Sequence, residues 1–508
     1  MKETNNRNRV RLLSLSLLSA ILFSAVSCAA GPVDPGAAES AAETEAGSDA
    51  PLPFEDGAVY RIETPGWYAL SGGDYGAAEN AGVLTYGTAD DLNQLWRVHV
   101  AGGGILFENM SAGLYLNVRT DSKKEGAPLA LNSRSEIRSQ LWTAAPAEGK
   151  ENAFFLQNAA TGGFAKDTAE ETTGTAVQTL LSEDATPWTF KKIAGPDTVF
   201  PRVLILSGDY VSAANCPEIR KIGGVYYNFN QAGGIAIKRS SDLRRWTSVG
   251  TVVQTTPDWL RKGGYGSIWA PGCYLVGDTL RCYYAVSSFG SQNSAIGMAY
   301  CANGNPASDW KDGGMVISSK AGDPYNCIDP NIFVEDDGTT YLIFGSYWTG
   351  IYMRKIDPAT GLLDETDPTL WHLAQGQGEM EAPYLIKKDG YYYLFVAMGN
   401  ISKNDTYHWA VGRSESLFGP YLDKKGNPML EGNVFALTEY KNGVQRVGHA
   451  QCFLDDDGTY YMVAESWRDR FDPTCKVSLH ISTIVWNDQG WPVTALARDL
   501  PRELAGKK

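Results

Sequence analysis

A short pattern occurs five times after residue 200 of this 508-residue chain. Each copy places a motif, usually with proline, before an alternating run, a tight glycine turn and a tyrosine-rich strand. The copies begin NCPEIRKIGGVYYNF, WAPGCYLVGDTLRCYYAV, IDPNIFVEDDGTTYLIF, EAPYLIKKDGYYYLFV and GHAQCFLDDDGTYYMVA. Turns of GG, GD or DG between runs of period two predict β-hairpins. Intervals of roughly 53 to 68 residues suit four-stranded blades, so we expect a five-bladed β-propeller.

Propeller geometry gives the repeated motif a functional meaning. The first strand of each blade starts at the central channel, so the motif residues of all five copies should converge there. Those residues are Cys216, Trp269, Asp329, Glu381 and His449. Two carboxylates and a histidine at one channel mouth form a candidate active site, although a single acidic residue there often only caps a strand.

Residues 53–195 carry another repeat, with a period of 46 residues, in NQLW, SQLW and TPW, which end at Trp96, Trp142 and Trp188. Strand-like runs separated by glycine turns favour a three-fold all-β unit. The Q-x-W spacing resembles the ricin-type β-trefoil lectins, in which this tryptophan is a core residue. Where that resemblance implies a sugar-binding aspartate, the chain has Asn117 and Lys166. Sugar binding and a scaffold or spacer role therefore both stay open. The predicted fold class is all-β, a β-trefoil followed by a five-bladed β-propeller.

The N-terminus has the composition of an export signal. Lys2 and three arginines precede a short apolar run, and small residues lead to Cys28 in AVSC. This pattern resembles a bacterial lipobox, which implies lipidation of Cys28; an ordinary cleaved signal peptide is the alternative. We predict a lipoprotein signal peptide over 1–28 and a disordered tether over 29–52. No other stretch approaches about 18 apolar residues, so we expect no second membrane span. The signal-like N-terminus predicts a lipid-anchored protein of the bacterial cell envelope or a secreted one.

Charge and cysteine content narrow the expected partners. The net charge of −14 disfavours nucleic acid and anionic membrane surfaces, since both are bound through clustered Lys and Arg. We expect a monomer that binds a polysaccharide or oligosaccharide. Seven cysteines follow Cys28, so at least one lacks an intrachain disulfide partner. If the turn at Gly277 and Asp278 has two residues, Cys273 faces Cys282 as a thiol pair or a disulfide.

Motifs over residues ~201–500 resemble glycoside hydrolase family 43, and most closely its endo-1,5-α-L-arabinanases. They include SIWAP, SAIGMAY, YNCIDPNIF, GSYWTGI, MEAPYLI, VGRSESLFGPY and VGH. The resemblance implies a five-bladed propeller over 200–502 and hydrolysis, with inversion, of arabinose-containing glycans such as α-1,5-linked arabinan. It implies that Glu381 is the general acid and that Asp329 tunes the pKa of this acid and orients the sugar. It also implies that His449 contacts one calcium ion, mostly through water.

Other motifs of the resemblance border the family's cleft and carry the expected substrate contacts. These residues are Trp269, Phe289, Asn326, Ser346 and Trp348. The aromatic rings would form a platform for the sugar, and packing between blades is the alternative for each of them.

One motif departs from the family. Its first-blade motif is usually His-Asp-Pro, whose aspartate is the general base, and this chain has Asn215, Cys216 and Pro217. The aspartate of the second-blade motif is replaced by Gly272. A free thiol has a pKa of about 8.5, and nearby carboxylates raise it, so Cys216 is a poor replacement for the base.

Three interpretations of this substitution stay open. In the first, another group is the base, with Glu218 on the same strand face as Cys216 and Asp209 just upstream as candidates. In the second, the domain is a non-catalytic carbohydrate-binding protein that keeps the cleft. In the third, Cys216 is a nucleophile in a retaining reaction. We expect a glycosidase; a hydrolase of another glycan and a purely structural or interaction role are further alternatives.

Overall fold

The structure is a computed structural model of the protein, and it describes residues 54–66, 68–72, 79–88, 92–135, 137–168, 177–178, 180–204, 206–208, 214–402, 406–438, 444–468 and 477–496. The predicted signal peptide and tether, with Cys28, lie outside these residues, as does Asp209. The described part contains no helix that is long and apolar enough to span a membrane. It is built almost wholly of β-strands, which confirms the all-β prediction.

The N-terminal part is a sheet that closes when its first strand, β1, pairs with its last strand, β14. Hydrogen bonds connect the strands in the order β12-β4-β2-β1-β14-β10-β9-β6-β7-β8-β3. Its elements are β1 (Val59–Glu63), β2 (Tyr68–Ser71), β3 (Ala81–Gly82), β4 (Leu84–Gly87), η1 (Leu92–Gln94), β5 (Leu95–Ala101), β6 (Gly104–Asn109), β7 (Tyr115–Val118), η2 (Arg119–Asp121), β8 (Leu129–Asn132), η3 (Arg138–Gln140), β9 (Trp142–Pro146), β10 (Ala153–Asn158), β11 (Phe164–Lys166), β12 (Val177–Gln178), β13 (Leu180–Ser182) and β14 (Pro187–Ala194).

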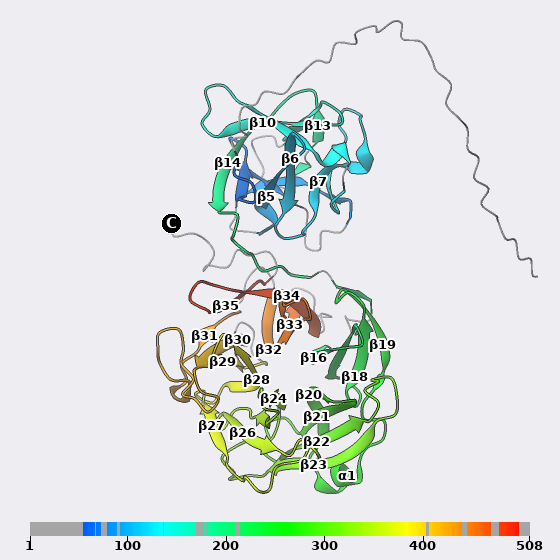
Figure 1. The fold of residues 1–508 in the computed structure, drawn as a ribbon, viewed down its shortest axis with the longest axis vertical. Helices are drawn as coiled ribbons and strands as arrows, with labels where there is room; N and C mark the ends of the chain where they lie inside the picture. The colour runs from blue at the N-terminus through cyan, green and yellow to red at the C-terminus, as the bar shows by residue number, and fades with distance from the viewer. Residues whose placement is uncertain are drawn as a thin grey trace, which may run out of the picture. The chain divides into compact units, whose positions relative to one another are not determined.

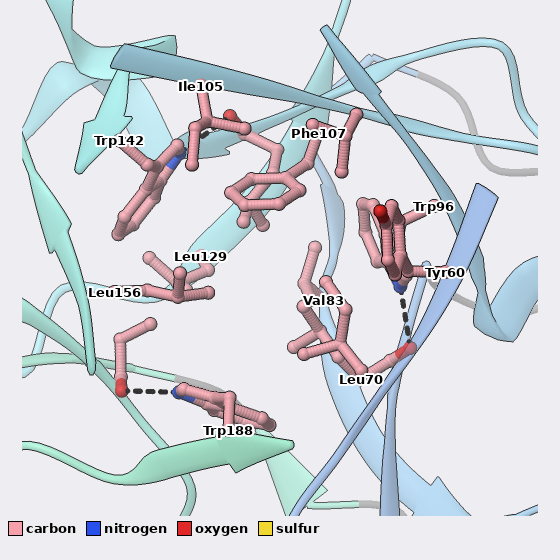
Figure 2. Packing of buried hydrophobic residues seen from close by; sticks show 14 of the residues in the cluster. Tyr60, Leu70, Val83, Trp96, Ile105, Phe107, Leu129, Trp142, Leu156 and Trp188 are labelled. Carbon is pink, nitrogen blue, oxygen red and sulfur yellow. Dashed lines mark hydrogen bonds between the residues drawn. The ribbon is translucent and has the colours of Figure 1, made fainter. Parts of the chain in front are cut away.

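The three tryptophans of the 46-residue repeat lie in one hydrophobic core, as the repeat predicts (Figure 2). Trp96, Trp142 and Trp188 are each fully buried. Each indole N–H donates a hydrogen bond to a backbone carbonyl oxygen of its own repeat, over 2.8, 3.3 and 3.0 Å respectively. A buried N–H without a partner is costly. These hydrogen bonds therefore allow an indole ring to pack in the core at each of the three repeats.

The glutamine of the repeat stabilises the loop before each tryptophan. The side-chain amide of Gln94 donates to the carbonyl oxygen of Gly87 over 2.9 Å, and that of Gln140 to Ser133 over 2.8 Å. The third repeat has Thr186 near this position, and its hydroxyl oxygen accepts the backbone N–H of Asp167 over 3.0 Å. The shorter Thr186 side chain therefore stabilises the third loop by accepting a hydrogen bond, where the glutamines donate one.

The C-terminal part is a series of antiparallel meanders, apart from the parallel pairing of β15 with β19 and of β30 with β32. Its elements are β15 (Ser207–Gly208), β16 (Asn215–Ile222), β17 (Val225–Gln231), β18 (Ala236–Ser240), β19 (Arg245–Thr251), α1 (Asp258–Gly263), β20 (Ser267–Val276), β21 (Thr279–Ser287), β22 (Ser294–Cys301), β23 (Lys311–Ser319), β24 (Asn331–Val334), β25 (Thr340–Phe344), β26 (Ile351–Ile356), β27 (Trp371–Ala374), β28 (Met380–Lys388), β29 (Tyr391–Met398), β30 (His408–Ser414), η4 (Met429–Glu431), β31 (Phe435–Ala436), β32 (Val444–Leu454), β33 (Tyr460–Arg468), β34 (Val477–Trp486) and β35 (Pro492–Thr494).

The strands that carry the repeated motif lie toward the middle of the C-terminal part (Figure 1). They contact one another in sequence around a closed circuit, from β16 to β20, β24, β28, β32 and back to β16. The strands that end each meander lie farther out, as the labels β19, β23 and β27 show (Figure 1). This arrangement brings five motifs, far apart in the sequence, to one centre.

The hairpin register predicted for the second copy is confirmed. Val276 pairs with Thr279 across the two-residue turn, and Cys273 pairs with Cys282 three positions farther along. Both cysteines are buried, and their thiols are free rather than joined in a disulfide. The register follows from local turn chemistry, because Gly277 has a φ of 54° and so supplies the left-handed residue that such turns favour.

Candidate active site

Four motif residues have a left-handed backbone at the same place in their repeats. The φ angles are 51° for Cys216, 57° for Asp329, 51° for Ala382 and 41° for His449. For a residue other than glycine this conformation costs roughly 1–2 kcal/mol, and such residues are frequent at functional centres. The repeat thus aligns Ala382 with Asp329. The interpretation that Glu381 and Asp329 occupy matching positions is wrong, because Glu381 stands one residue earlier.

Glu381 lies at the start of β28 and is held from two sides. The Ser346 hydroxyl donates to Oε2 over 2.9 Å, and the Tyr407 hydroxyl donates to Oε1 over 2.8 Å. Burial raises the pKa of Glu381, while these two hydrogen bonds act in the opposite direction. The carboxyl group is therefore fixed in orientation and more easily protonated than an exposed glutamate.

Asp329 lies beside this glutamate. The backbone N–H of Ala382, which belongs to the peptide directly after Glu381, donates to Oδ2 of Asp329 over 3.2 Å. Asp329 is 6% exposed, and burial and then the charge of Glu381 raise its pKa well above the usual value. The structure therefore brings the two carboxyl groups predicted from the sequence into one electrostatically coupled pair.

Cys216 faces the same group of carboxylates. Burial raises the pKa of its thiol well above the ordinary value, and the charges of Glu465, Asp329 and Glu381 act in the same direction. The thiol donates to Oε1 of Gln231 over 3.4 Å. Both effects disfavour the thiolate, which is the form that a base or a nucleophile requires.

Glu465 is a third carboxylate at this centre, and sequence reasoning missed it. It lies on β33 and is fully buried. Its Oε2 accepts the backbone N–H of Cys216 over 2.9 Å, and burial, followed by the effect of Glu381, raises its pKa to about 8. The available signal was a charged residue inside the apolar strand YYMVAESW of the fifth copy.

Glu218 does not lie where the sequence predicts it. The pairing register of β16 shifts between Asn215 and Glu218, so strict alternation fails and Glu218 does not share the face of Cys216. Its carboxylate forms an ion pair of 2.6 Å with Arg220, and it is 4% exposed. The shared face is therefore wrong. Burial raises the pKa of Glu218 to about 7 in spite of this ion pair, and Glu218 as a base stays a prediction.

His449 lines a small cavity together with Asp329 and Glu218. The cavity has a volume of about 20 Å³, which holds roughly one water-sized particle. Burial lowers the pKa of His449 to about 3, so its ring is neutral.

This cavity does not fit the expected calcium ion. Calcium takes about six to eight oxygen ligands, and an ion held mostly through water needs room for several waters. In the described residues no group of three His, Cys, Asp or Glu side chains is placed to hold a metal. The residues therefore do not fit a mostly hydrated calcium ion, and a metal at His449 stays a prediction.

The residues predicted to bind sugar differ in exposure. The segment after β25 contains Tyr347 and Trp348, which have φ angles of 54° and 43° and together turn the chain sharply. This turn leaves Ser346 buried on Glu381 and Trp348 40% exposed. An exposed indole next to a residue that holds the acid is well placed for a sugar platform.

The remaining predicted contacts are spread around the centre. Phe289 is 81% exposed in the loop between β21 and β22, and Trp269 is partly buried on β20. Asn326 is 2% exposed, and no described residue donates to its Oδ1. A buried acceptor normally has a donor, and a sugar hydroxyl in this role stays a prediction.

A pocket of about 650 Å³ opens against Tyr407, the residue that bonds to Glu381. Its wall includes Gln377, Glu379, His408 and Arg446. This volume lies within the range of small-molecule sites, and its polar lining suits a hydroxylated ligand.

In the N-terminal part, the two side chains predicted at sugar-binding positions bond to other residues of the protein. The Asn117 amide, which is 3% exposed, donates to Asp121 and to Asn132, each over 3.2 Å. Lys166 forms an ion pair of 2.8 Å with Asp184. Neither side chain is arranged as the carboxylate acceptor that a sugar site of this kind would need.

Two family models match the chain. The model of glycosyl hydrolases family 43 matches residues 211–492, more than half of the chain. The model of the ricin-type beta-trefoil lectin domain-like family matches residues 92–180. Both agree with the resemblances found in the motifs.

Similar proteins share the C-terminal part. An extracellular exo-α-(1→5)-L-arabinofuranosidase of Cellvibrio japonicus is 33% identical over 298 residues, which cover 54% of this chain and 84% of the relative. An extracellular endo-α-(1→5)-L-arabinanase of Bacillus subtilis is 38% identical over 230 residues, or 42% of this chain and 69% of the relative. The solved α-L-arabinanase of Cellvibrio cellulosa with arabinohexaose aligns with a TM-score of 0.53 and 30% identity, over 56% of this chain and 95% of the other.

Proposed function

The chain belongs to glycosyl hydrolases family 43 and is a glycosidase, and from this premise we propose that it hydrolyses the α-1,5-L-arabinofuranosyl bonds of arabinan with inversion. The observation that carries the proposal is the paired carboxyl arrangement of Glu381, held by Ser346 and Tyr407, beside the buried Asp329. Relatives named as arabinanases, which match this part of the chain, support the choice of substrate.

Glu381 is the general acid of the proposed reaction. Burial raises its pKa, which favours the protonated form that must deliver a proton to the leaving oxygen. The hydrogen bonds from Ser346 and Tyr407 fix the direction in which the carboxyl group points. As the glycosidic bond breaks, water attacks the anomeric carbon from the opposite face of the sugar, which inverts its configuration.

Asp329 assists the acid without giving up a proton to the substrate. Its Oδ2 accepts the amide N–H of Ala382, which places it one peptide away from Glu381. When either carboxyl group is ionised, repulsion favours the proton on the other. Trp348, Trp269 and Phe289 supply the apolar faces on which the sugar rings lie, and Asn326 accepts a sugar hydroxyl.

The proposed architecture is a five-bladed propeller over 200–502 behind a ricin-type β-trefoil over 53–195. The circuit of contacts among β16, β20, β24, β28 and β32, and the left-handed residue repeated at the start of the inner strands, support the five blades. Of the two roles left open for the trefoil, sugar binding has less support than a scaffold or spacer role. The side chains of Asn117 and Lys166 bond to other residues of the protein. We favour a spacer that carries the catalytic part away from its anchor.

The location that we propose is the bacterial cell envelope, with lipid on Cys28 and residues 29–52 as a tether, or the medium after secretion. The signal-like N-terminus supports export, and the relatives named above are described as extracellular. Membrane attachment would then be through the lipid alone, and the protein would act as a monomer on polysaccharide.

A non-catalytic carbohydrate-binding protein is the second candidate. Its specific support is Cys216, which stands where the family has an aspartate and whose thiol stays protonated. Such a protein would keep the cleft and the aromatic platform but release no sugar. A hydrolase of another glycan that uses a different base is the remaining alternative.

One experiment separates these candidates. The purified protein is incubated with debranched arabinan and with a panel of pectic and xylan oligosaccharides, and both release and binding are measured. Release that Glu381→Gln abolishes, without a change in melting temperature, supports the enzyme. Binding without release, with activity gained in Cys216→Asp, would instead establish the binding protein. If the protein neither binds nor cleaves any of these glycans, the enzyme and the binding protein are both overturned.

A further inference from the structure

The proposed hydrolysis requires a base that the motif residues do not supply. Inversion needs a carboxylate that removes a proton from the attacking water, on the face of the sugar opposite the acid. Asp329 accepts the amide next to Glu381 and so lies on the side of the acid. Glu218 is ion-paired with Arg220, and burial together with the neighbouring carboxylates disfavours the thiolate of Cys216.

Glu465 brings a carboxylate from another strand to the backbone of Cys216, the residue that stands where the family has its base. Its Oε2 lies 2.9 Å from the backbone nitrogen of Cys216. An aspartate at position 216 would extend its own carboxylate from this same residue. The carboxylate is thus delivered to the site by β33 rather than by β16, from a residue 249 positions away.

Tyr407 connects Glu465 to the acid. In the pairing of β32 with β33, Gly448 lies opposite Glu465, and a Cβ atom on Gly448 would stand 2.3 Å from the ring of Tyr407. The ring therefore packs against the glycine beside Glu465, while its hydroxyl bonds to Glu381. Burial, and then the charges of Glu381 and Glu465, raise the pKa of Tyr407, so both carboxyl groups lie near this one side chain.

The Glu465 carboxylate is also available for a water molecule. It is fully buried, and its Oε1 accepts no hydrogen bond from any residue that the structure describes. Buried carboxylate oxygens normally have a donor, so this atom is suited to bind the water that reacts. Burial raises the pKa of Glu465 to about 8, and the hydrogen bond from Cys216 and the positive charge of Arg446 act in the opposite direction, toward the ionised form that accepts a proton.

We propose that Glu465, on β33, is the general base of this enzyme. It takes the role that the family gives to an aspartate at position 216. The inference rests on the proposed function. One water proton passes to Glu465 while the water oxygen bonds to the anomeric carbon. The glycosidic bond breaks at the same time, and the leaving oxygen takes the proton of Glu381. The products are a shortened glycan and a sugar with inverted configuration.

The test compares Glu465→Gln, Glu381→Gln and Glu335→Gln with the wild-type protein on debranched arabinan. Glu335 is a matched control, since it is a hydrogen-bonded glutamate on the outer end of the β24–β25 hairpin, paired with Lys387 and Tyr392. We expect Glu465→Gln to lower kcat by about 10²–10⁴-fold with little change in KM and a native melting curve. The control should retain at least half of the wild-type kcat.

Azide rescue distinguishes a base from a residue that merely supports the fold. In Glu465→Ala, azide can enter the space of the carboxylate and bond to the anomeric carbon, while Glu381 still protonates the leaving oxygen. We expect azide to restore turnover and to yield a β-L-arabinofuranosyl azide. Glu465→Ser serves the same purpose if Glu465→Ala does not fold.

The remaining outcomes overturn the inference in distinguishable ways. Glu465→Gln with more than a third of the wild-type kcat, or a folded and inactive variant that azide does not rescue, shows that Glu465 is not the base while the proposed hydrolysis stands. A wild-type protein that releases no sugar, and matches Glu381→Gln in this respect, overturns the base and the proposed function together.

Discussion

The hydroxyl of Tyr407 donates a hydrogen bond of 2.8 Å to Oε1 of Glu381. This bond favours the ionised carboxylate and so holds the pKa of Glu381 down against the effect of burial. Tyr407→Phe should therefore raise the pKa of the acid. We expect the alkaline limb of the kcat/KM profile to move to higher pH by roughly 0.5–1 unit, because Ser346 still donates its own bond.

Tyr421→Phe provides the control for this pH profile. Its hydroxyl is buried and donates to the carbonyl oxygen of Leu417 over 2.7 Å, away from the carboxylates of the centre. The control should leave the alkaline limb in place. An equal displacement in both variants, or none in Tyr407→Phe, would contradict the role assigned to the bond.

Gly272 stands where the family resemblance implies an aspartate, and the backbone explains its size. A Cβ atom on this residue would lie 2.2 Å from the carbonyl oxygen of Pro330. Gly272→Ala should lower the free energy of unfolding by roughly 1–3 kcal/mol, since either strand must shift. Chemical denaturation measures the change, and Gly250→Ala, whose added methyl group meets nothing within 4 Å, should be close to neutral. Equal stability of the two variants would show that β20 and Pro330 are farther apart than described.

The Cys216 thiol should be unreactive in the folded protein. Its pKa is raised well above the ordinary value, so the thiolate that attacks alkylating reagents is scarce at pH 7.5. We expect iodoacetamide to leave Cys216 unmodified in native buffer and to modify it in denaturant, as read by mass spectrometry. Rapid native modification together with loss of activity would instead favour the nucleophile interpretation.

Glu465 should make stability depend on pH. Its folded pKa of about 8 lies above the value of about 4.3 expected in the unfolded chain. The folded state therefore holds the proton more tightly, and this contribution to stability is lost as the pH rises from about 4.5 to 8. Glu465→Gln removes the effect, so its stability relative to the wild-type protein should increase from pH 5 to pH 8 by a few kcal/mol at most. Urea denaturation at several pH values measures this, and parallel curves would contradict it.

Calcium at His449 is checked by chelation. Since the cavity beside this histidine holds roughly one water-sized particle, we expect EDTA to change neither kcat nor the melting temperature. Back-titration with calcium and then with sodium controls for ionic strength. A fall in melting temperature that calcium alone reverses would show that the channel opens further than the structure describes and that the family's ion is present.

Local chemistry made much of this structure predictable from the sequence. The Trp96, Trp142 and Trp188 core follows from the 46-residue spacing, and the pairing of Cys273 with Cys282 follows from a two-residue turn. The first depends on a regular repeat, and the second on residues close together in the chain. The carboxyl pair of Asp329 and Glu381 was also found, because each lies in a repeated motif that the fold brings to one centre.

The errors arose where the backbone departs from regular strands or where distant strands meet. Glu218 was placed on the face of Cys216 by strict alternation, and the shift in register at this motif removes that relationship. Glu465 was missed because its contact with Cys216 spans 249 residues and because it lies beyond the motif residues, on the second strand of the fifth copy. No spacing rule predicts a hydrogen bond between residues so far apart in the sequence.

The bond between Cys216 and Glu465 also bears on the order of folding. Nearby, the N–H of Leu204 donates to the carbonyl oxygen of Ile481 over 2.8 Å, so the beginning of the C-terminal part is paired with its end. Contacts of such large sequence separation form slowly, because a long loop must close first. A nascent chain that stops before residue 477 would contain every motif residue and Glu465 but would lack the strand that secures its beginning to its end. Assembly of the carboxylate centre is therefore coupled to completion of the polypeptide, and truncated products should be inactive even where their sheets have formed.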